Sequence, residues 1–305
     1  MTGASGYVGS RLVGSLEGHD VRALVRKRVD YLPDAQQVEI DLADGGPGLT
    51  DALAGVDAVV HLAGLNEVVA SQDPDRALAE TAVASRHVAT ATRAAGVRRL
   101  VYVSTVHVYG ALLTEGSVIS EDLPPEPRSG YAVARLASEH LIQEGTPLET
   151  LVLRLSNAIG APADVAVDRW SLVATDLSRQ AAATGRMVLR SSGLQWRDFI
   201  TLGDVCSIVG TCATGDVDPG TYNLASGRSA TVRHVAELIG DRVEHHTGTR
   251  PVLEAPEHDG PPPLPYRVAV DRLAAQGLSA STPLVDGVDE LVSFCLQHAS
   301  ELANG

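Results

Sequence analysis

The sequence has few cysteines and no long apolar run. Its 305 residues include three cysteines, Cys206, Cys212 and Cys295, and none of them forms a C-x-x-C pair. Scattered cysteines of this kind indicate buried, reduced thiols and exclude a disulfide framework. No apolar run approaches the roughly 18 residues of a membrane helix, and the N-terminus is rich in glycine where a signal peptide would be basic and then apolar. We therefore expect a cytoplasmic protein that does not contact membranes.

Positive charge is also scarce. The chain has 24 lysines and arginines against 38 aspartates and glutamates, which gives a net charge of −14 at pH 7. Such a field repels nucleic acid and anionic membranes, so we expect neither as a partner. The 44% of hydrophobic and 20% of charged residues are ordinary for a folded protein. The length suffices for an enzyme with one large domain or two small ones.

Short β-branched runs alternate with helical stretches in the first half of the chain. The helical stretches are residues 7–16 and 76–95, and Gly96 ends the second one. This alternation predicts an α/β fold with a doubly wound parallel sheet of the Rossmann type. The expected strands are residues 21–25, 38–40, 58–62, 100–103 and 151–155.

The pattern loosens after Ile159 and predicts a smaller, mixed domain. We expect a dinucleotide-binding domain over residues 1–158 and a substrate-binding domain over 159–305, with segments near 198–225 returning to the first. Four prolines between positions 261 and 265 predict a loop. The other expected elements are helices 170–183, 232–239 and 285–302, and strands near Phe199 and at 222–224.

Three glycines spaced three residues apart open the chain. Gly3 permits a tight turn, Gly6 lets backbone N–H groups approach a pyrophosphate, and Gly9 lets the following helix lie close to the sheet. The N-terminus of that helix then faces the phosphates. We predict a dinucleotide-binding loop formed by Gly3, Ser5, Gly6, Tyr7, Val8 and Gly9.

This motif normally follows the central strand of the sheet. Here only Met1 precedes Thr2. We therefore expect the first strand to be truncated in this sequence and the natural protein to begin several residues upstream.

The end of the second strand selects the cofactor in such folds, because an acidic residue there binds the ribose of NAD. Residues 25–28 are Val-Arg-Lys-Arg and contain no carboxylate. Guanidinium groups match a phosphate, so Arg26 and Arg28 favour NADP over NAD, although a solvated basic turn would have the same sequence. Asp41, Leu42, Leu62, Ala63 and Gly64 stand where adenine and ribose would lie, or else belong to ordinary loops.

Tyr131 and Arg135 share one face of a predicted helix, since they are spaced i and i+4. A tyrosine phenol has a pKa near 10, so acid–base work near pH 7 requires a neighbouring positive charge that stabilises the phenolate. Ser104 and Thr105 follow the strand at 100–103, at the edge where open α/β sheets bind ligands. We predict that Tyr131 is the general acid–base, that Arg135 supplies the charge, and that Thr105 holds the substrate oxygen.

These motifs together resemble the extended short-chain dehydrogenase/reductase family, in particular its NAD-dependent epimerase/dehydratase group. The resemblance spans essentially the whole chain and implies that Tyr131 is the acid–base and Thr105 its hydrogen-bonding partner. It also implies that Arg135 stands where the family has a lysine that binds the nicotinamide ribose, and we expect Ser104, Tyr131 and Arg135 to bind the cofactor. It rests on the glycine motif at 2–9, His-Leu-Ala-Gly at 61–64, Ser-Thr-x-x-x-Tyr-Gly at 104–110, Tyr-x-x-x-Arg at 131–135, Arg-Leu-Ser-Asn at 154–157 and Trp-Arg-Asp-Phe-Ile at 196–200.

The chain departs from the family pattern at several positions. Arg135 stands where the family has a lysine, so the charge is kept more surely than the geometry toward the ribose. Thr81 replaces a helical asparagine, and Ile159 replaces a tyrosine. Residues 255–260 contain no arginine where many relatives bind the second phosphate of a sugar nucleotide, which puts such a substrate in question.

The remaining candidates concern the substrate. By the resemblance, Arg197 contacts a sugar-nucleotide pyrophosphate, and Thr105, His107, Asn157 and Arg169 complete the substrate site, although packing roles would also explain His107 and Arg169. His245, His246 and His258 lack the spacing of a metal site, so we expect a surface loop there and no bound metal.

We expect an NAD(P)-dependent oxidoreductase that transfers a hydride at a carbinol or ketone carbon of a sugar or sugar nucleotide. The basic residues near Arg26 favour an NADPH-dependent ketoreductase. An epimerase or dehydratase that retains NAD is the alternative, and an NADP-binding sensor without turnover is a second one. Many relatives pair through two helices of the dinucleotide domain, so a homodimer is expected.

Overall fold

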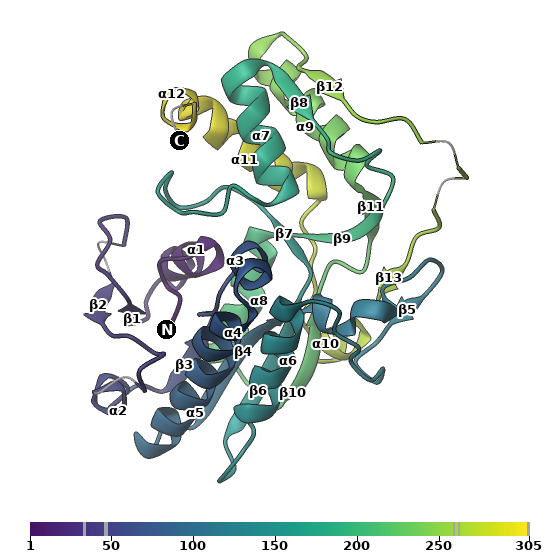
Figure 1. The fold of residues 1–305 in the computed structure, drawn as a ribbon. Coiled ribbons are helices and arrows are strands. Elements are labelled where there is room, and N and C mark those ends of the chain that lie inside the picture. The colour runs from purple at the N-terminus through teal and green to yellow at the C-terminus, as the bar shows by residue number, and fades with distance from the viewer. Residues whose placement is uncertain (33–34, 46–47, 259, 262, 304–305) are drawn as a thin grey trace.

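The computed structural model describes residues 1–32, 35–45, 48–258, 260–261 and 263–303. A parallel β-sheet lies at its centre, in the spatial order β2, β1, β3, β4, β6, β10 (Figure 1). All seven residues of β4 are buried, as expected of a parallel strand that is covered on both faces. The strands are β1 (Arg22–Val25), β2 (Gln36–Glu39), β3 (Ala58–His61), β4 (Arg99–Thr105), β6 (Glu149–Leu155) and β10 (Gly220–Leu224).

Helices cover both faces of this sheet, so the predicted doubly wound α/β architecture is confirmed. Val101 and Val103 of β4 contact the helices on one face, while Leu100 and Tyr102 contact those on the other. This follows from the alternation of side chains along a strand. The first face carries α1 (Tyr7–Ser15) and α8 (Leu202–Thr214), and the second carries α2 (Leu49–Ala52), α5 (Ala84–Ala94) and α6 (Gly130–Leu141).

Met1 and Thr2 occupy the position between β1 and β3. Thr2 forms parallel bridges to Leu24 and to His61. The Thr2 N–H donates to Val60 O at 2.9 Å, and the Met1 carbonyl accepts from Leu24 N at 2.7 Å. Thr2 therefore joins β1 to the rest of the sheet immediately before the glycine turn.

The long helical stretch predicted at 76–95 contains a change of helix type. It consists of α4 (Pro74–Ala77), a π-helical segment (Leu78–Val83) and α5. Within the π-helical segment, the Thr81 carbonyl accepts hydrogen bonds from the hydroxyls of Ser85 and Ser138, while its hydroxyl accepts from Leu65 N. Gly96 has φ +71° directly after this stretch, as the prediction of a C-terminal glycine requires.

A second hydrophobic core lies above the sheet in Figure 1. It is formed by α7 (Val173–Thr184), α9 (Val232–Thr247) and α11 (Leu284–Gln297), which pack on the sheet β11–β9–β7. The remaining elements are β5 (Val118–Ile119), β7 (Asn157–Ile159), β8 (Arg186–Val188), β9 (Trp196–Thr201), β11 (Ser229–Thr231), β12 (Val252–Glu254), β13 (Arg267–Val268), α3 (Glu67–Gln72), α10 (Asp271–Ala275), α12 (Ala299–Leu302) and a 3₁₀ segment (Val106–Leu112).

Three details of the second half differ from the sequence-based expectation. Helix α9 continues eight residues beyond the expected end at 239, so His245 and His246 lie in its last turn and not in a loop. The predicted helix 285–302 is divided at His298 into α11 and α12. Trp170 precedes α7, which begins at Val173. Position 262 of the proline-rich segment lies outside the described residues, and the described remainder of that segment has no helix or strand.

The three cysteines are free and buried, as predicted. Among the helices that the structure describes, none has the length and hydrophobicity of a membrane-spanning segment.

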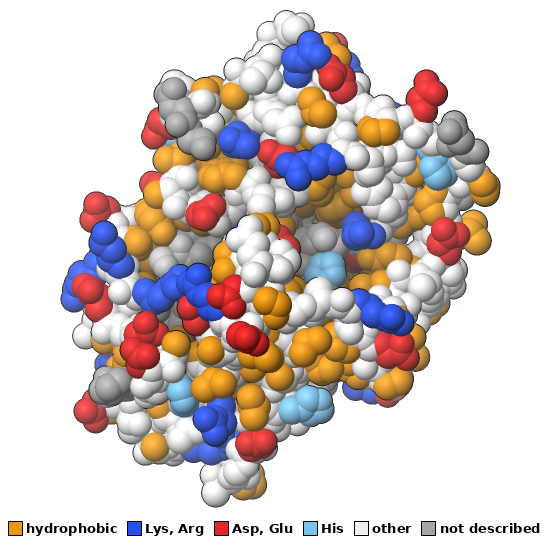
Figure 2. Space-filling view, viewed as in Figure 1, with side chains coloured by type: hydrophobic (Ala, Val, Ile, Leu, Met, Phe, Trp, Pro, Cys, Tyr) orange, Lys and Arg blue, Asp and Glu red, His pale blue; other side chains and the backbone are white. Residues whose placement is uncertain are grey.

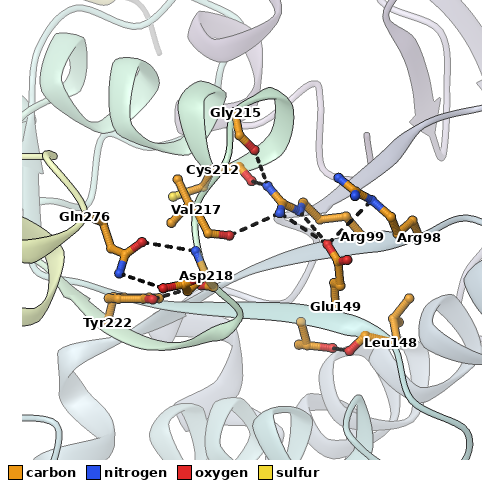
Figure 3. Close-up of polar contacts among 11 residues, drawn as sticks. Arg98, Arg99, Leu148, Glu149, Cys212, Gly215, Val217, Asp218, Tyr222 and Gln276 are labelled. Carbon is orange, nitrogen blue, oxygen red and sulfur yellow. Dashed lines mark hydrogen bonds and ion pairs between the residues drawn. The ribbon is translucent and has the colours of Figure 1, made fainter.

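Arg99 joins the sheet to α8 at the edge opposite the carboxyl ends of the strands (Figure 3). Arg99 is only 4% exposed, and its guanidinium donates to the carbonyls of Cys212, Gly215 and Val217 and to the Glu149 carboxylate. These carbonyls belong to the end of α8 and the chain after it, where helix carbonyls have no intrahelical partner. Arg99 therefore satisfies buried polar groups that would otherwise be unpaired.

We expect Arg99→Met to lower the free energy of unfolding by about 2–4 kcal/mol, because it leaves the carbonyls of Cys212, Gly215 and Val217 without their donor. Arg98→Gln is the matched control, since Arg98 is 72% exposed and lies 3.6 Å from the same carboxylate. That variant should change stability by less than about 0.5 kcal/mol. Urea unfolding measures both, and equal effects of the two variants would contradict the role given to Arg99.

His61 is fully buried in β3 and bonded on both ring nitrogens. Its Nδ1 lies 2.6 Å from Thr2 Oγ1, and its Nε2 lies 2.8 Å from Ser85 Oγ. Burial, together with the positive charge of Arg135, lowers the pKa of His61 to about 3. The folded protein therefore keeps this imidazole neutral, whereas the unfolded chain protonates it below about pH 6.5.

The unfolded state consequently binds one more proton at this residue than the folded state between about pH 6 and 4. His61 should make the wild type lose stability as the pH falls through this window, by about 1.4 kcal/mol per pH unit. We expect His61→Gln to remove this part of the slope. Urea unfolding of both proteins from pH 7 to 4 measures it, and identical slopes would contradict a neutral His61 in the folded state.

Candidate active site

A cleft of about 740 Å³ opens at the carboxyl ends of the parallel strands. This is the edge at which open α/β sheets bind ligands, and the volume is in the range of small-molecule sites. One wall is the glycine loop before α1, and another is the start of α6. Strand β7, residues 166–169 and 171–172 after it, and the start of α7 also line the cleft.

The glycine loop brings the backbone of α1 against the first turn of the chain. A Cβ on Gly9 would lie 2.1 Å from Gly3 O, and a Cβ on Gly3 would lie 2.7 Å from Ala63 N. Gly3 also has φ +66°, which favours glycine. The tight turn predicted at Gly3 is thus present, and Gly9 brings α1 close to this turn. The N-terminus of α1 faces the cleft, and Gly3, Ser5, Gly6, Tyr7, Val8 and Gly9 all line it.

Two side chains that were not predicted from the sequence form hydrogen bonds at or next to this loop. The Tyr31 hydroxyl donates to Ser5 O at 2.8 Å, and the Thr2 hydroxyl accepts from Ala63 N at 3.4 Å. Arg11 of α1 donates to Ala161 O and pairs with Glu290, which ties α1 to the segment on the other side of the cleft.

We expect Gly9→Ala to destabilise the protein by about 1–3 kcal/mol, because the added methyl group forces α1 away from the turn. The same displacement should weaken dinucleotide binding by more than about tenfold. Gly14→Ala is the control in the same helix, since a Cβ there meets no atom within 4 Å. It should stabilise the protein by up to about 1 kcal/mol. Urea unfolding and fluorescence titration with dinucleotide measure these effects, and equal behaviour of the two variants would contradict the close approach.

Tyr131, Arg135 and Thr105 all line the cleft. Helix α6 is capped by Ser129, whose hydroxyl accepts from Ala132 N, so Tyr131 lies in the first turn. The Arg135 guanidinium lies over the Tyr131 ring, with 5.5 Å from Cζ to the ring centre. Thr105 ends β4 and caps the 3₁₀ segment by accepting from His107 N. The structure thus brings together the three side chains for which the sequence predicts catalysis.

Arg135 is only 8% exposed and stays charged in the cleft wall. Burial opposes its charge, but Tyr102 and Tyr131 beside it raise the pKa of the guanidinium above its usual value. Its Nη1 donates to Val103 O at 3.3 Å. Its Nε is buried and has no hydrogen-bond partner among the described residues, which is uncommon for a buried donor in a folded protein.

Ser104 lines the cleft but directs its hydroxyl to the interior. The hydroxyl donates to Glu139, which also accepts two nitrogens of Arg154, the shortest contact being 2.7 Å. Arg154 Nη1 then donates to the Tyr109 hydroxyl, and this hydroxyl donates to Asn223. This buried network joins β4, α6, β6 and β10 directly beneath Thr105, and it explains why Arg154 occurs in the motif at 154–157.

The far end of the cleft carries charged side chains from both halves of the chain. Arg169 pairs with both carboxylate oxygens of Glu67, at 3.2 and 2.7 Å, and this pair joins α3 to the segment after β7. Although burial opposes its ionisation, Arg169 lowers the pKa of Glu67. Glu67 was not predicted from the sequence, since a single acidic residue at the start of a helix is common on protein surfaces.

The other predicted substrate residues are placed as follows. His107 projects into the cleft with its ring centre 6.3 Å from that of Tyr131, and burial and Arg197 lower its pKa. Asn157 lines the cleft while its amide donates to Asp198 O at 2.8 Å. Arg197 is not among the lining residues, and its Nη1 donates to the carbonyl of Trp196.

Only some of the residues predicted to bind adenosine line the cleft. Arg26 lines the cleft, and so do Leu62 and Gly64. Arg28 does not, because its guanidinium pairs with Glu39 at 3.2 Å. Asp41 accepts from Ala43 N, the Leu42 carbonyl contacts His87, and neither residue lines the cleft, nor does Ala63. Arg76, which the sequence did not single out, also lines the cleft.

The residues present fit a nicotinamide dinucleotide. Gly3 and Gly9 keep this loop compact, because a Cβ on either would collide with neighbouring backbone atoms, and the loop lies at a helix N-terminus suited to phosphates. The buried Nε of Arg135, which has no partner among the described residues, belongs to the guanidinium that lies over the Tyr131 ring. The glycine loop would hold the pyrophosphate, Arg26 the adenosine end, and Arg135 the nicotinamide end.

Comparison with known proteins agrees with this geometry. The model of the NAD dependent epimerase/dehydratase family matches residues 1–225. A GDP-6-deoxy-D-mannose reductase of Pseudomonas aeruginosa is 33% identical over 258 residues, which cover 79% of this chain and 78% of the relative.

Two solved structures cover nearly the whole chain. A complex of MoeE5 with UDP-glucuronic acid and NAD has a TM-score of 0.81 at 26% identity and covers 97% of this chain and 98% of the other. The structure of RMD from Pseudomonas aeruginosa with NADPH has a TM-score of 0.75 at 25% identity and covers 97% of each chain.

The chain belongs to the NAD-dependent epimerase/dehydratase family. It is an enzyme that uses NAD or NADP, with the Rossmann-type sheet and the Tyr-x-x-x-Arg site described above.

Proposed function

We propose that the chain is an NADPH-dependent ketoreductase that acts on a sugar carried by a nucleoside diphosphate. The observation that carries this proposal is the single cleft in which the glycine loop, Thr105, Tyr131 and Arg135 meet. A dinucleotide held by the loop would place its nicotinamide at the end of the cleft where a phenol and a fixed cation are adjacent.

The chain's own residues would then handle the proton. A bound nicotinamide supplies or accepts the hydride. In the reducing direction the Tyr131 hydroxyl gives its proton to the oxygen that was the ketone, while the Thr105 hydroxyl donates a hydrogen bond to the same oxygen. Arg135 stabilises the phenolate that remains, because a buried guanidinium beside the ring favours the charged form. Solvent returns the proton to Tyr131 before the next turnover.

The reductive direction is supported by the adenosine end of the cleft. Arg26 lines the cleft there, and residues 26–28 after β1 are Arg-Lys-Arg, with no carboxylate among them. A relative similar over most of the chain is named a reductase, and one structural neighbour binds NADPH. A second candidate, an epimerase that retains NAD, is favoured by the neighbour that binds NAD and UDP-glucuronic acid.

Arg169, Asn157 and His107 lie at the far end of the cleft and are the proposed contacts of the sugar and its nucleotide. Because Arg169 is held by Glu67, substrate has to share or replace this ion pair. Arg197 has no place in the lining, so its contact with a pyrophosphate stays a prediction, as does the homodimer.

The test uses a panel of nucleotide sugars that includes GDP-6-deoxy-D-mannose, each with NADP⁺, and measures the formation of NADPH. We expect Tyr131→Phe to lower kcat by about 10²–10⁴-fold, because it removes the proton donor. The Kd of NADPH should stay within about twofold, because the hydroxyl contributes little to binding.

Tyr222→Phe is the matched control. Its hydroxyl donates to Asp218 O at the opposite edge of the sheet (Figure 3), so turnover should not change. Full turnover in Tyr131→Phe would refute the catalytic assignment. Conversion of a sugar without NADPH formation, by protein that releases bound NAD on denaturation, would replace the reductase with the epimerase.

A further inference from the structure

Two arginines from different elements meet at one carboxylate on the edge of the cleft. Arg26 follows β1, and Arg76 belongs to α4. Arg26 Nη1 lies 3.5 Å from Glu80 Oε2, and Arg76 Nε lies 2.6 Å from Glu80 Oε1. Figure 2 shows basic and acidic side chains gathered on the surface between β1 and α4. Arg26, Glu80 and Arg76 are called the adenosine-end cluster below.

This cluster contributes little to the stability of the fold. Arg26 and Arg76 are 70% and 47% exposed, and exposed ion pairs contribute at most about 1 kcal/mol. The pair on the helix also has the arginine four residues before the glutamate, which is the weaker orientation relative to the helix dipole. Stability alone therefore does not explain why both guanidiniums point at one place on the cleft.

The position of the cluster suits one part of a dinucleotide. Both arginines line the same cleft as Gly3, Ser5 and Gly6, and Tyr131 and Arg135 line this cleft as well. In a sheet of this kind the adenosine ribose lies at the end of the strand that precedes Arg26. A group attached to the 2′ oxygen of that ribose would lie between β1 and α4.

The charge of the cluster suits an anion at this position. Two guanidiniums face one carboxylate, which leaves one net positive charge. Guanidinium groups bind phosphate oxygens with paired, charge-assisted hydrogen bonds. Glu80 holds both arginines at the cleft edge, and a phosphate dianion offers more acceptor oxygens than this carboxylate does.

We propose that Arg76 and Arg26 together bind the 2′-phosphate of NADP(H), and that Glu80 orients the two arginines when no phosphate is bound. This inference rests on the proposed function for the cofactor, and it adds a residue from α4 that determines cofactor specificity. Arg28 has no part in it, because its guanidinium pairs with Glu39 outside the cleft.

The test is isothermal titration of the full chain with NADP⁺ and, separately, with NAD⁺, so it does not depend on the sugar substrate. Arg76→Gln should raise the Kd of NADP⁺ by about tenfold or more, because it removes charge-assisted hydrogen bonds to a phosphate. The Kd of NAD⁺ should change by less than about twofold, since NAD⁺ lacks that phosphate.

Arg250→Gln is the matched control. Arg250 is 45% exposed and pairs with Asp241 and Glu244 on α9, so it has similar exposure and partners but lies outside the cleft. It should leave both Kd values unchanged. Glu80→Gln removes the competing carboxylate and should tighten NADP⁺ binding by a few-fold, while NAD⁺ binding does not tighten.

The outcomes separate this inference from the proposed function. Equal weakening of NADP⁺ and NAD⁺ by Arg76→Gln, or no weakening of NADP⁺, would overturn the role of Arg76 and leave the family function intact. Tight NAD⁺ binding without NADP⁺ binding by the wild type would overturn both this inference and the reductase. Binding of neither dinucleotide by the wild type would refute the whole cofactor assignment.

Discussion

The close approach of α1 to the first turn of the chain is the constraint on which the rest of the site depends. Gly9 and Gly3 allow this contact because neither has a side chain to separate the two backbones. The approach aims the N-terminus of α1 along the edge of the sheet, so that unpaired N–H groups face the cleft. Tyr31 holds the turn through Ser5 O, Thr2 bonds to Ala63 beside it, and Arg11 ties α1 to Ala161.

Charge is buried next to this cleft in two different ways. Glu139 and Arg154 form a pair in which the two ions satisfy each other and two hydroxyls, so this network is complete and structural. Arg135 is buried without a carboxylate among its hydrogen-bond partners, and it has one donor left over. An incompletely satisfied buried cation is costly for folding, and such costs are typical of functional sites.

The replacement of the family lysine by Arg135 also affects how the site can work. A guanidinium cannot lose its proton near neutral pH, so the charge beside Tyr131 is permanent. The guanidinium is also planar and lies over the phenol ring. A lysine ammonium would contact the same ring as a compact point charge. Helix α6 therefore fixes the two residues next to each other, and the guanidinium charge acts directly on the phenol ring.

Local pattern in the sequence was sufficient for several conclusions. The alternating runs determined the parallel sheet, the glycine spacing determined the loop, and the i, i+4 spacing placed Tyr131 beside Arg135, since each depends on a few neighbouring residues. The sequence could not show that Arg26 lines the cleft while Arg28 does not. Arg28 pairs with Glu39 only because β1 and β2 lie side by side in the fold. It could not select Arg76 or Glu67, because both resemble solvated helix residues until α3 and α4 are placed against the cleft. Ion pairs between residues as distant as Glu67 and Arg169 are decided by tertiary structure, since the chain folding back over the sheet is what brings their charges within 3 Å.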